Sequence, residues 1–314
     1  MSGTASGARA FTFLVNPVAG GGAAPGAVVP VARLLREAAA EVEVTYSPGP
    51  LATRALVAEA VAAGRVVVSV GGDGMLASLA GEVSRLGGTL GLVPAGRGND
   101  FARMLGVPDD PAGQAALLLE AAPRRVDLLS WQPPPGPGSA GEALLVAGSV
   151  YAGVDARAAA MVARMRRVPR RLQYPLAAVR SLLTYRPVHV RVAVDGTAHD
   201  YDAAMVVVAN SSFYGKGMKI APAADVADGL LDVVVVEAAS KRALVRALPT
   251  VYDGSHVDRS EVTVLRGTRV ELSATSEAGP VPVGGDGEPL GSLPGDADEP
   301  AVVAVAPAVL TLLA

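Results

Sequence analysis

A glycine-rich turn with one acidic residue contains the residue types that handle phosphate groups. Gly71, Gly72, Asp73 and Gly74 follow the apolar run Val66–Val70 and precede a segment with helical spacing. Glycines let backbone N–H groups approach phosphate oxygens, and the N-terminus of a following helix adds a favourable dipole. Asp73 would be repelled by a phosphate unless a cation lay between them, so it indicates Mg²⁺ or a proton relay. A plain tight turn, with Asp73 as the N-cap of the helix, is the alternative.

Two further glycine-rich segments also follow apolar runs. Asn16–Gly22 lacks the Lys-Ser/Thr pair of a Walker A loop and the spacing of a dinucleotide fingerprint, so a phosphate loop and a plain linker both remain open. Leu92–Ala102 contains Arg97, whose planar guanidinium suits a phosphate, and Asn99, which could equally cap a helix.

The first 130 residues alternate short apolar runs with segments of helical spacing, which predicts βαβ units and a largely parallel sheet. Ligands of such sheets bind at the carboxyl ends of the strands, where the three glycine-rich segments lie. The predicted strands are Phe11–Val15, Val42–Tyr46, Val66–Val70, Thr89–Val93 and Arg125–Trp131. The predicted helices are Val28–Ala40, Leu51–Ala63, Met75–Leu86 and Pro111–Ala121.

The second half of the chain has a different pattern. After the Pro/Gly-rich loop Gln132–Glu142, short apolar runs are separated by turn residues, which predicts an antiparallel, sandwich-like domain. One helical segment, Val154 to about Thr184, interrupts this pattern. The predicted strands are Val188–Val194, Tyr201–Ala209, Leu230–Glu237, Val262–Leu265 and Arg269–Leu272.

Composition narrows the class of protein. A chain of 314 residues that is 50% hydrophobic can bury a sizeable core, and its length suggests about two domains. The net charge of −3 gives no general attraction to nucleic acid, and the absence of Cys excludes disulfides and thiolate metal sites. No apolar run reaches the length of a signal peptide or a membrane span, so we expect a cytoplasmic protein that meets a membrane only at its surface. The sequence carries no signal for an oligomeric state.

Five motifs in order give the chain a specific resemblance. Asn16-Pro17 with Gly20, the Gly71–Gly74 turn and the segment Pro94–Arg103 (PAGRGNDFAR) resemble the catalytic domain of the diacylglycerol kinase family, which includes sphingosine kinases. Two later segments, Ile220–Asp232 and Gly285–Leu290, resemble the metal-site segment and the catalytic loop of that family.

The resemblance implies a fold. It is an α/β nucleotide-binding domain similar to those of phosphofructokinases and NAD kinases, followed by a β-rich, sandwich-like second domain. We expect the ATP-binding domain at 1–130, joined by the C-terminal segment 301–314, and the lipid- and metal-binding domain at 131–300. The active site is expected in the cleft between them.

The resemblance also implies roles for individual residues. Glu288 would be the general base, and Asp73 and Asp127 would belong to an Asp–water–Mg²⁺ network. Asp228 would bind Mg²⁺ through its carboxylate, together with the carbonyls of Asp225 and Leu230. The ATP contacts would be Asn16, Pro17, Gly20, Gly21, Thr45, Gly71, Gly72, Asp73, Gly74, Arg97 and Asn99.

The expected activity is ATP- and Mg²⁺-dependent phosphorylation of a lipid hydroxyl, with diacylglycerol as the leading acceptor and phosphatidic acid as product. A kinase of another lipid alcohol such as a sphingoid base, an NAD kinase, and a catalytically weak or dead lipid-binding protein on the same fold are the alternatives. Met75 and Arg97 stand where the family usually has hydroxyl residues, which favours the weak or dead reading. The retained carboxylates of Asp73, Asp228 and Glu288 favour catalysis.

A basic segment offers a membrane contact. Arg157–Arg186 contains eight Arg and no acidic residue, with apolar residues interleaved. This composition is typical of a helix that lies on an anionic membrane surface, and a solvated helical face is the alternative.

Overall fold

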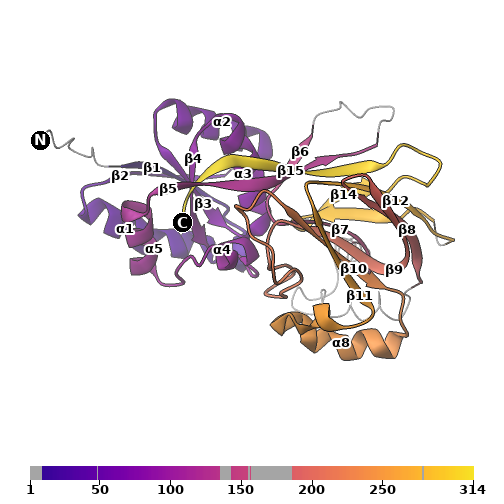
Figure 1. Cartoon of the computed structure of the whole chain (residues 1–314). Coiled ribbons are helices and arrows are strands. Elements are labelled where there is room, and N and C mark those ends of the chain that lie inside the picture. The colour runs from indigo at the N-terminus through magenta and orange to yellow at the C-terminus, as the bar shows by residue number, and fades with distance from the viewer. Residues whose placement is uncertain (1–8, 48, 135–142, 155, 157–185, 278) are drawn as a thin grey trace, which may run out of the picture. The chain divides into compact units, whose positions relative to one another are not determined.

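The computed structural model describes residues 9–47, 49–134, 143–154, 156, 186–277 and 279–314. The chain forms two compact units, shown in Figure 1. Unit 1 comprises Met1–Val126 and Ala308–Ala314, and unit 2 comprises Asp127–Pro307.

Unit 1 is built on a parallel sheet. The strands β1 (Ala10–Val15), β2 (Glu41–Tyr46), β3 (Val66–Gly71) and β4 (Thr89–Pro94) are arranged in the order β4–β3–β1–β2. The end of β15 (Ala301–Leu313) adds a further parallel partner, since Thr311 and Leu312 pair with β4. The helices of this unit are α1 (Ala24–Glu37), α2 (Pro50–Ala62), α3 (Asp73–Arg85), α4 (Asp100–Met104) and α5 (Pro111–Glu120), with a 3-10 turn η1 at Ala19–Gly21.

The burial of each strand follows its place in this sheet. Strands β1 and β3 are buried almost continuously, as expected for strands covered by helices on both faces. Strand β2, at the edge, is nowhere fully buried, and Glu41 and Glu43 are exposed and lie within ion-pair distance of Arg65. Such charges protect a sheet edge against pairing with another chain.

Unit 2 is antiparallel. One path of hydrogen-bonded neighbours runs β14–β13–β7–β9–β8–β12–β15, β10 pairs with β9 and β11, and β5 pairs with β6. The sandwich-like core is formed mainly by Val, Leu and Ala side chains of these strands and includes Trp131. The strands are β5 (Pro123–Gln132), β6 (Leu144–Val146), β7 (Ser149–Gly153), β8 (Val188–Val194), β9 (Thr197–Ala209), β10 (Leu231–Glu237), β11 (Val262–Gly267), β12 (Arg269–Thr275), β13 (Pro282–Gly285) and β14 (Glu288–Ser292).

One helix of unit 2 was not predicted from the sequence. Helix α8 (Lys241–Asp253) begins at the N-cap Ser240, whose hydroxyl accepts the N–H of Ala243, and ends at Gly254 in the left-handed conformation. Pro249 lies inside this helix, at a position where proline normally interrupts a helical pattern. The predicted helical segment from Val154 to Thr184 lies almost entirely outside the described residues.

The packing of α5 on the sheet gives a test of the unit 1 core. Leu118 is fully buried, and a Cβ atom on Gly91 of β4 would lie only 2.5 Å from its Cδ2. We expect Leu118→Ala to lower the free energy of unfolding by about 2–5 kcal/mol, because it leaves a cavity in a close-packed core. Urea unfolding followed by circular dichroism measures the change.

Leu86→Ala is the matched control, since this side chain is 42% exposed and its removal leaves no cavity. Equal losses in the two variants would contradict the packing described here.

Candidate functional site

Two of the glycine-rich loops in unit 1 meet through their backbones. Gly72 follows β3 and Gly96 follows β4, and a Cβ atom built on Gly96 would lie 2.3 Å from the Cα of Gly72. The N–H of Ala95 donates to the carbonyl of Gly71 at 2.8 Å. Only glycine permits an approach this close, so the two loops form one backbone surface at the carboxyl ends of β3 and β4.

The loop after β1 joins this surface. Gly20 has a φ of +61°, and a Cβ atom there would lie 2.3 Å from the carbonyl oxygen of Ala95. The N–H of Asn16 donates to the carbonyl of Val70 at 3.1 Å, and its side-chain oxygen accepts the N–H of Val18 at 3.1 Å. The first predicted segment is therefore packed against the other two loops.

The predicted nucleotide residues mostly lie together on these loops. Arg97 reaches the first loop, because a Cβ atom on Gly21 would be 3.6 Å from its Nη2. Asn99 adopts a left-handed φ of +54° and its side chain bonds the backbone of Gly96. It stands at the N-cap position of α4 but makes no side-chain capping bond. Thr45 lies one strand away, on β2 opposite Leu14.

Asp73 does not cap its own helix, so the turn-with-N-cap alternative is wrong. The N-cap of α3 is Gly72, and α3 begins at Asp73, two residues before the predicted start. The carboxylate instead accepts the N–H of Phe101 at 3.2 Å, in the first turn of α4. Burial raises the pKa of Asp73 above its ordinary 3.8, the charge of Asp100 adds to the rise, and the backbone bonds from residues 99–101 oppose it.

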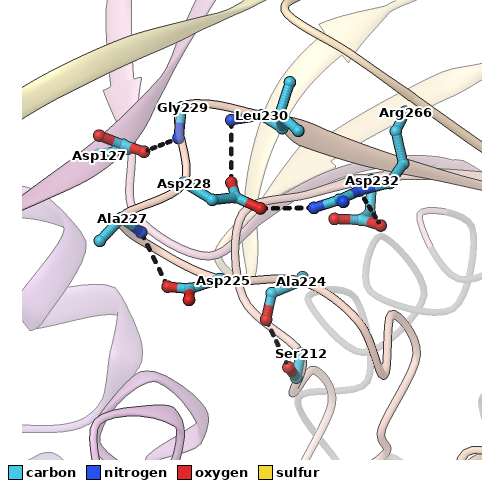
Figure 2. A network of polar contacts seen from close by, with 10 residues as sticks. All are labelled: Asp127, Ser212, Ala224, Asp225, Ala227, Asp228, Gly229, Leu230, Asp232 and Arg266. Carbon is cyan, nitrogen blue, oxygen red and sulfur yellow. Dashed lines mark hydrogen bonds and ion pairs between the residues drawn. The ribbon is translucent and has the colours of Figure 1, made fainter.

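In unit 2, an acidic loop formed by Asp225–Leu230 directly precedes β10 (Figure 2). Asp225 accepts the N–H of Ala227 at 3.0 Å, and Asp228 accepts the N–H of Leu230 at 2.9 Å. Asp127, buried on β5, accepts the N–H of Gly229 at 2.8 Å. The loop is therefore held by two local Asx-turn bonds of its own carboxylates and by one bond from the distant Asp127.

Asp228 shares Arg266 with a second carboxylate. The guanidinium of Arg266, on β11, pairs with Asp228 and, at 3.1 Å through Nε, with Asp232 of β10. Asp232 is only 2% exposed. Burial raises the pKa of Asp232 above 3.8, which Arg266 opposes and Asp228 reinforces. Sequence reasoning missed Arg266, because nothing in its local sequence marks it, and it assigned no role to Asp232 although this residue ends the predicted metal-site segment.

The donors of this loop suit a magnesium ion. The Asp228 side chain is 27% exposed, so a cation can reach it from solvent. Within the described residues no group of three or more His, Cys, Asp or Glu could hold a metal ion. Mg²⁺ does not need such a group, since it is commonly bound through one or two carboxylates and keeps several waters. The carbonyls of Asp225 and Leu230 are oxygen donors of the same hard type.

The predicted catalytic loop is a β-hairpin. Asp286 and Gly287, between β13 and β14, have φ values of +47° and +91°, as a type I′ turn requires. The Asp286 carboxylate accepts the N–H groups of Ala147, Gly148 and Ser149 at 2.7–3.1 Å. Glu288 begins β14 and is exposed. Asp286 thus holds the turn that presents Glu288, a positioning role that the sequence did not reveal.

Asn210 holds the same region from the other side. This side chain is fully buried, and its Nδ2 donates to the carbonyls of Asp127 and Ala147, each at 2.9 Å. It therefore links the strand that carries Asp127 to the loop that Asp286 grips. The sequence does not mark this role, because Asn210, directly after β9, reaches both carbonyls only through the pairing of distant strands.

Comparison with known proteins places this chain. Residues 10–131 match the diacylglycerol kinase catalytic domain, and residues 148–314 match the YegS C-terminal NAD kinase beta sandwich-like domain. A diacylglycerol kinase of Mycobacterium tuberculosis is 34% identical over 266 residues, which cover 83% of this chain and 84% of that protein. The chain belongs to the diacylglycerol kinase family. The resemblance stated from the motifs is confirmed, and this family member is an enzyme of the lipid-kinase class.

Other relatives agree. A diacylglycerol kinase of Bacillus subtilis is 24% identical over 234 residues, 74% of this chain and 73% of its own length. A solved structure described as a putative diacylglycerol kinase from Bacillus anthracis superposes with a TM-score of 0.76 at 19% identity, covering 100% of this chain and 98% of that one. Yeast NADH kinase gives a TM-score of 0.51 at 11% identity, covering 99% and 87%. These structures show the fold alone, and the predicted fold class is confirmed.

Two findings concern the membrane. In the part of this diacylglycerol kinase family member that the structure describes, no helix combines the length and apolar character needed to cross a bilayer. The basic segment Arg157–Arg186, predicted to touch a membrane surface, lies outside the described residues except for Arg186.

The raised pKa of Asp73 predicts a pH-dependent stability. A carboxyl whose pKa is higher in the folded state favours folding when protonated, so its contribution is present below pH 3.8 and is lost as the pH rises through the raised value. Asp73→Asn keeps an oxygen acceptor for Phe101 without the charge. We expect the metal-free variant to be more stable than the wild type at pH 7, with a difference that shrinks on acidification.

Thermal unfolding from pH 4 to pH 7 measures this difference. Asp200→Asn is the control, because the Asp200 side chain is 52% exposed. A variant that is less stable than wild type at pH 7 would show that the bonds to α4 outweigh the burial of charge.

Proposed function

We propose that this lipid kinase transfers the γ-phosphoryl group of Mg-ATP to the free hydroxyl of diacylglycerol, giving phosphatidic acid and ADP. The observation that carries the proposal is the convergence of three glycine-rich loops at the carboxyl ends of β1, β3 and β4, in a chain of this family. In the proposal, unit 1 binds the nucleotide and unit 2 binds the metal and the lipid. The predicted position of the active site between them stays a prediction.

The joined loops are suited to phosphate oxygens. Backbone N–H groups of Gly20, Gly21, Gly71, Gly72 and Gly74 can approach a ligand without side chains of their own in the way, and the N-terminus of α3 adds its dipole. Arg97, beside Gly21, supplies a planar charged donor for a phosphate. Asn16, Pro17, Thr45 and Asn99 complete the proposed nucleotide contacts.

The acidic loop of unit 2 is the proposed metal site. Asp228 would hold Mg²⁺ with the carbonyls of Asp225 and Leu230, and Asp73 and Asp127 would bind its waters. When bound, the ion neutralises the charge of the phosphate oxygens during transfer. The protein has to position these oxygen donors, and the short Asx bonds of the loop do so.

Glu288 is the proposed general base. It would accept the proton of the lipid hydroxyl as that oxygen forms a bond to the γ-phosphorus, while the bond from the γ-phosphorus to the bridging oxygen breaks and ADP leaves. A hydroxyl is a weak nucleophile at pH 7, and Glu288 is exposed at the rim of a hairpin anchored by Asp286.

An apolar pocket in unit 2 supports a lipid as the acceptor. The cavity of about 140 Å³ lies beside α8 and strands β9, β10 and β11, and its lining is mostly aliphatic and includes Met205, Met218 and Ile220. His256, at the same pocket, donates Nε2–H to the carbonyl of Ile220, and burial lowers its pKa and so favours the neutral form. A mostly aliphatic lining, whose charged residues Arg259 and Glu261 pair with each other, suits an acyl chain.

Met75 favours a second candidate, a kinase with weak nucleotide binding. A Cβ atom on Gly71 would lie 3.0 Å from the Met75 sulfur, so this thioether lies against the loop where the family usually has a hydroxyl donor. A sulfur atom cannot donate a hydrogen bond. A lipid-binding protein of low activity on the same fold would result if Arg97 did not compensate.

The deciding experiment is transfer of radiolabelled γ-phosphate from Mg-ATP to diacylglycerol in mixed micelles. We expect Glu288→Gln to lower kcat by roughly 10²- to 10⁴-fold with little change in the KM for ATP, because only proton removal is impaired. Glu299→Gln, at another exposed position of unit 2, is the control.

A loss confined to ATP affinity would remove Glu288 from the base role. Absence of labelled phosphatidic acid would contradict the choice of diacylglycerol as the acceptor. The same assay on sphingoid bases and on a total lipid extract then separates another lipid alcohol from an inactive protein.

Asp228 provides an independent test of the metal site. Asp228→Ala should raise the Mg²⁺ concentration for half-maximal activity by at least about tenfold, because the ion loses its carboxylate. The matching reduction in Mn²⁺ affinity can be measured by electron paramagnetic resonance on the nucleotide-free protein. Asp200→Ala removes a surface carboxylate of the same unit as the control, and equal metal affinity in both variants would place the ion elsewhere.

A further inference from the structure

Helix α8 exposes apolar side chains on one face. Val245, Leu248 and Tyr252 are 52%, 42% and 57% exposed. They are spaced i, i+3 and i+7, which places them on one side of a helix. Among the described residues they make up three of the nine large hydrophobic side chains that are exposed, so a third of these side chains lie on a single helix.

Basic residues border this face. Lys241, Arg242 and Arg246 are exposed, and no acidic residue occurs from Lys241 to Tyr252. Asp253 ends the helix, but its carboxylate is engaged by the N–H and hydroxyl of Ser255 at 2.9 and 2.6 Å. The helix therefore presents apolar and positively charged side chains together.

The opposite face of α8 lines the apolar pocket. Ala243, Leu244, Ala247 and Val251 face this cavity, and Leu248 belongs to both faces. No side chain of the helix is fully buried, which is unusual for an amphipathic helix packed on a core. The apolar surface thus continues from the pocket, around the helix, to the outside of unit 2.

We propose that the outer face of α8 docks this protein on the surface of an anionic phospholipid bilayer. Interfacial helices combine a basic flank with aliphatic and aromatic side chains that enter the headgroup region, and Tyr is favoured at that depth. The charges of Arg242 and Arg246 complement anionic headgroups. The docking rests on the proposed function in one respect, namely that the acceptor is a membrane lipid, which would reach the pocket directly beneath this helix.

The first test reverses the charges. In co-sedimentation with phosphatidylcholine vesicles containing phosphatidylglycerol, the double variant Arg242→Glu/Arg246→Glu should bind at least roughly 30-fold more weakly than wild type at low salt. Binding of the wild type should fall at high salt and on vesicles of phosphatidylcholine alone. Arg33→Glu/Arg54→Glu changes the same charge on α1 and α2, at side chains 72% and 64% exposed, and should bind like wild type.

The second test removes the apolar contact. Val245→Ser/Tyr252→Ser should weaken vesicle binding by roughly tenfold. Val29→Ser/Tyr46→Ser is matched residue for residue, with exposures of 63% and 51% in unit 1, and should not. Thermal unfolding midpoints equal to wild type show that each variant is folded.

The outcomes separate docking from catalysis. The α8 variants should keep wild-type activity on short-chain diacylglycerol in detergent micelles and lose it on vesicles, since none of the four changed side chains lines the pocket. Vesicle binding that is unchanged in both α8 variants, or equally reduced in the unit 1 controls, would overturn the proposal, even with full kinase activity. A protein that binds vesicles through α8 but phosphorylates no lipid would leave the docking intact and remove the proposed reaction.

Discussion

The close approach of two backbones, at Gly72 and Gly96, is the constraint on which the unit 1 site depends. A Cβ atom on Gly96 would lie 2.3 Å from the Cα of Gly72, so the loops after β3 and β4 can form one surface only if Gly96 carries no side chain, and a Cβ atom on Gly72 would make a tight contact of 3.1 Å with the Cα of Gly96. Other features follow from this contact. Gly20 approaches the carbonyl of Ala95, and the loops bring Asp73 next to the start of α4, where its carboxylate binds a free N–H. A partly buried carboxylate with a raised pKa is the result, which is common at functional sites because catalysis uses groups that a stable core avoids.

The carboxylates of unit 2 have different roles in the structure, which the sequence does not distinguish. Asp286, Asp127 and Asp225 bind backbone N–H groups and hold their loops in shape. Asp228 does this with one oxygen and presents the other to Arg266, and Glu288 is exposed. Asp228 remains 27% exposed although both of its oxygens have partners, and Glu288 is exposed, so these two side chains stay accessible from solvent. Asp232 has a related role. This buried carboxylate also pairs with Arg266, so the two acids share one guanidinium charge.

Helix α8 buries little of its surface, and the apolar surface left open is where we propose that lipid and membrane bind. Most helices of the described chain bury one face against a sheet, as α1 and α3 do. None of the side chains of α8 is fully buried, because its inner face borders a cavity and its outer face keeps apolar residues in solvent. Exposed apolar surface is unfavourable in water, and this free-energy cost is recovered only when a ligand or a bilayer covers the surface. The lowest local stability is therefore expected at the place where a lipid is proposed to enter.

The amino-acid sequence was sufficient to predict the local features: the alternation of strands and helices in unit 1, the antiparallel character of unit 2, the family, and the loops that contain Gly71–Gly74, Asp228 and Glu288. These depend on periodicity and on short motifs, which neighbouring residues specify. It did not reveal α8, which contains Pro249 in its interior, nor the partners of Asp73, Asp286 and Asn210, which lie 28, 137–139 and 63–83 residues away. These partners became known only from the tertiary structure. The role of a polar side chain depends on which backbone groups the fold brings to it, and pairing between strands distant in the sequence brings them together.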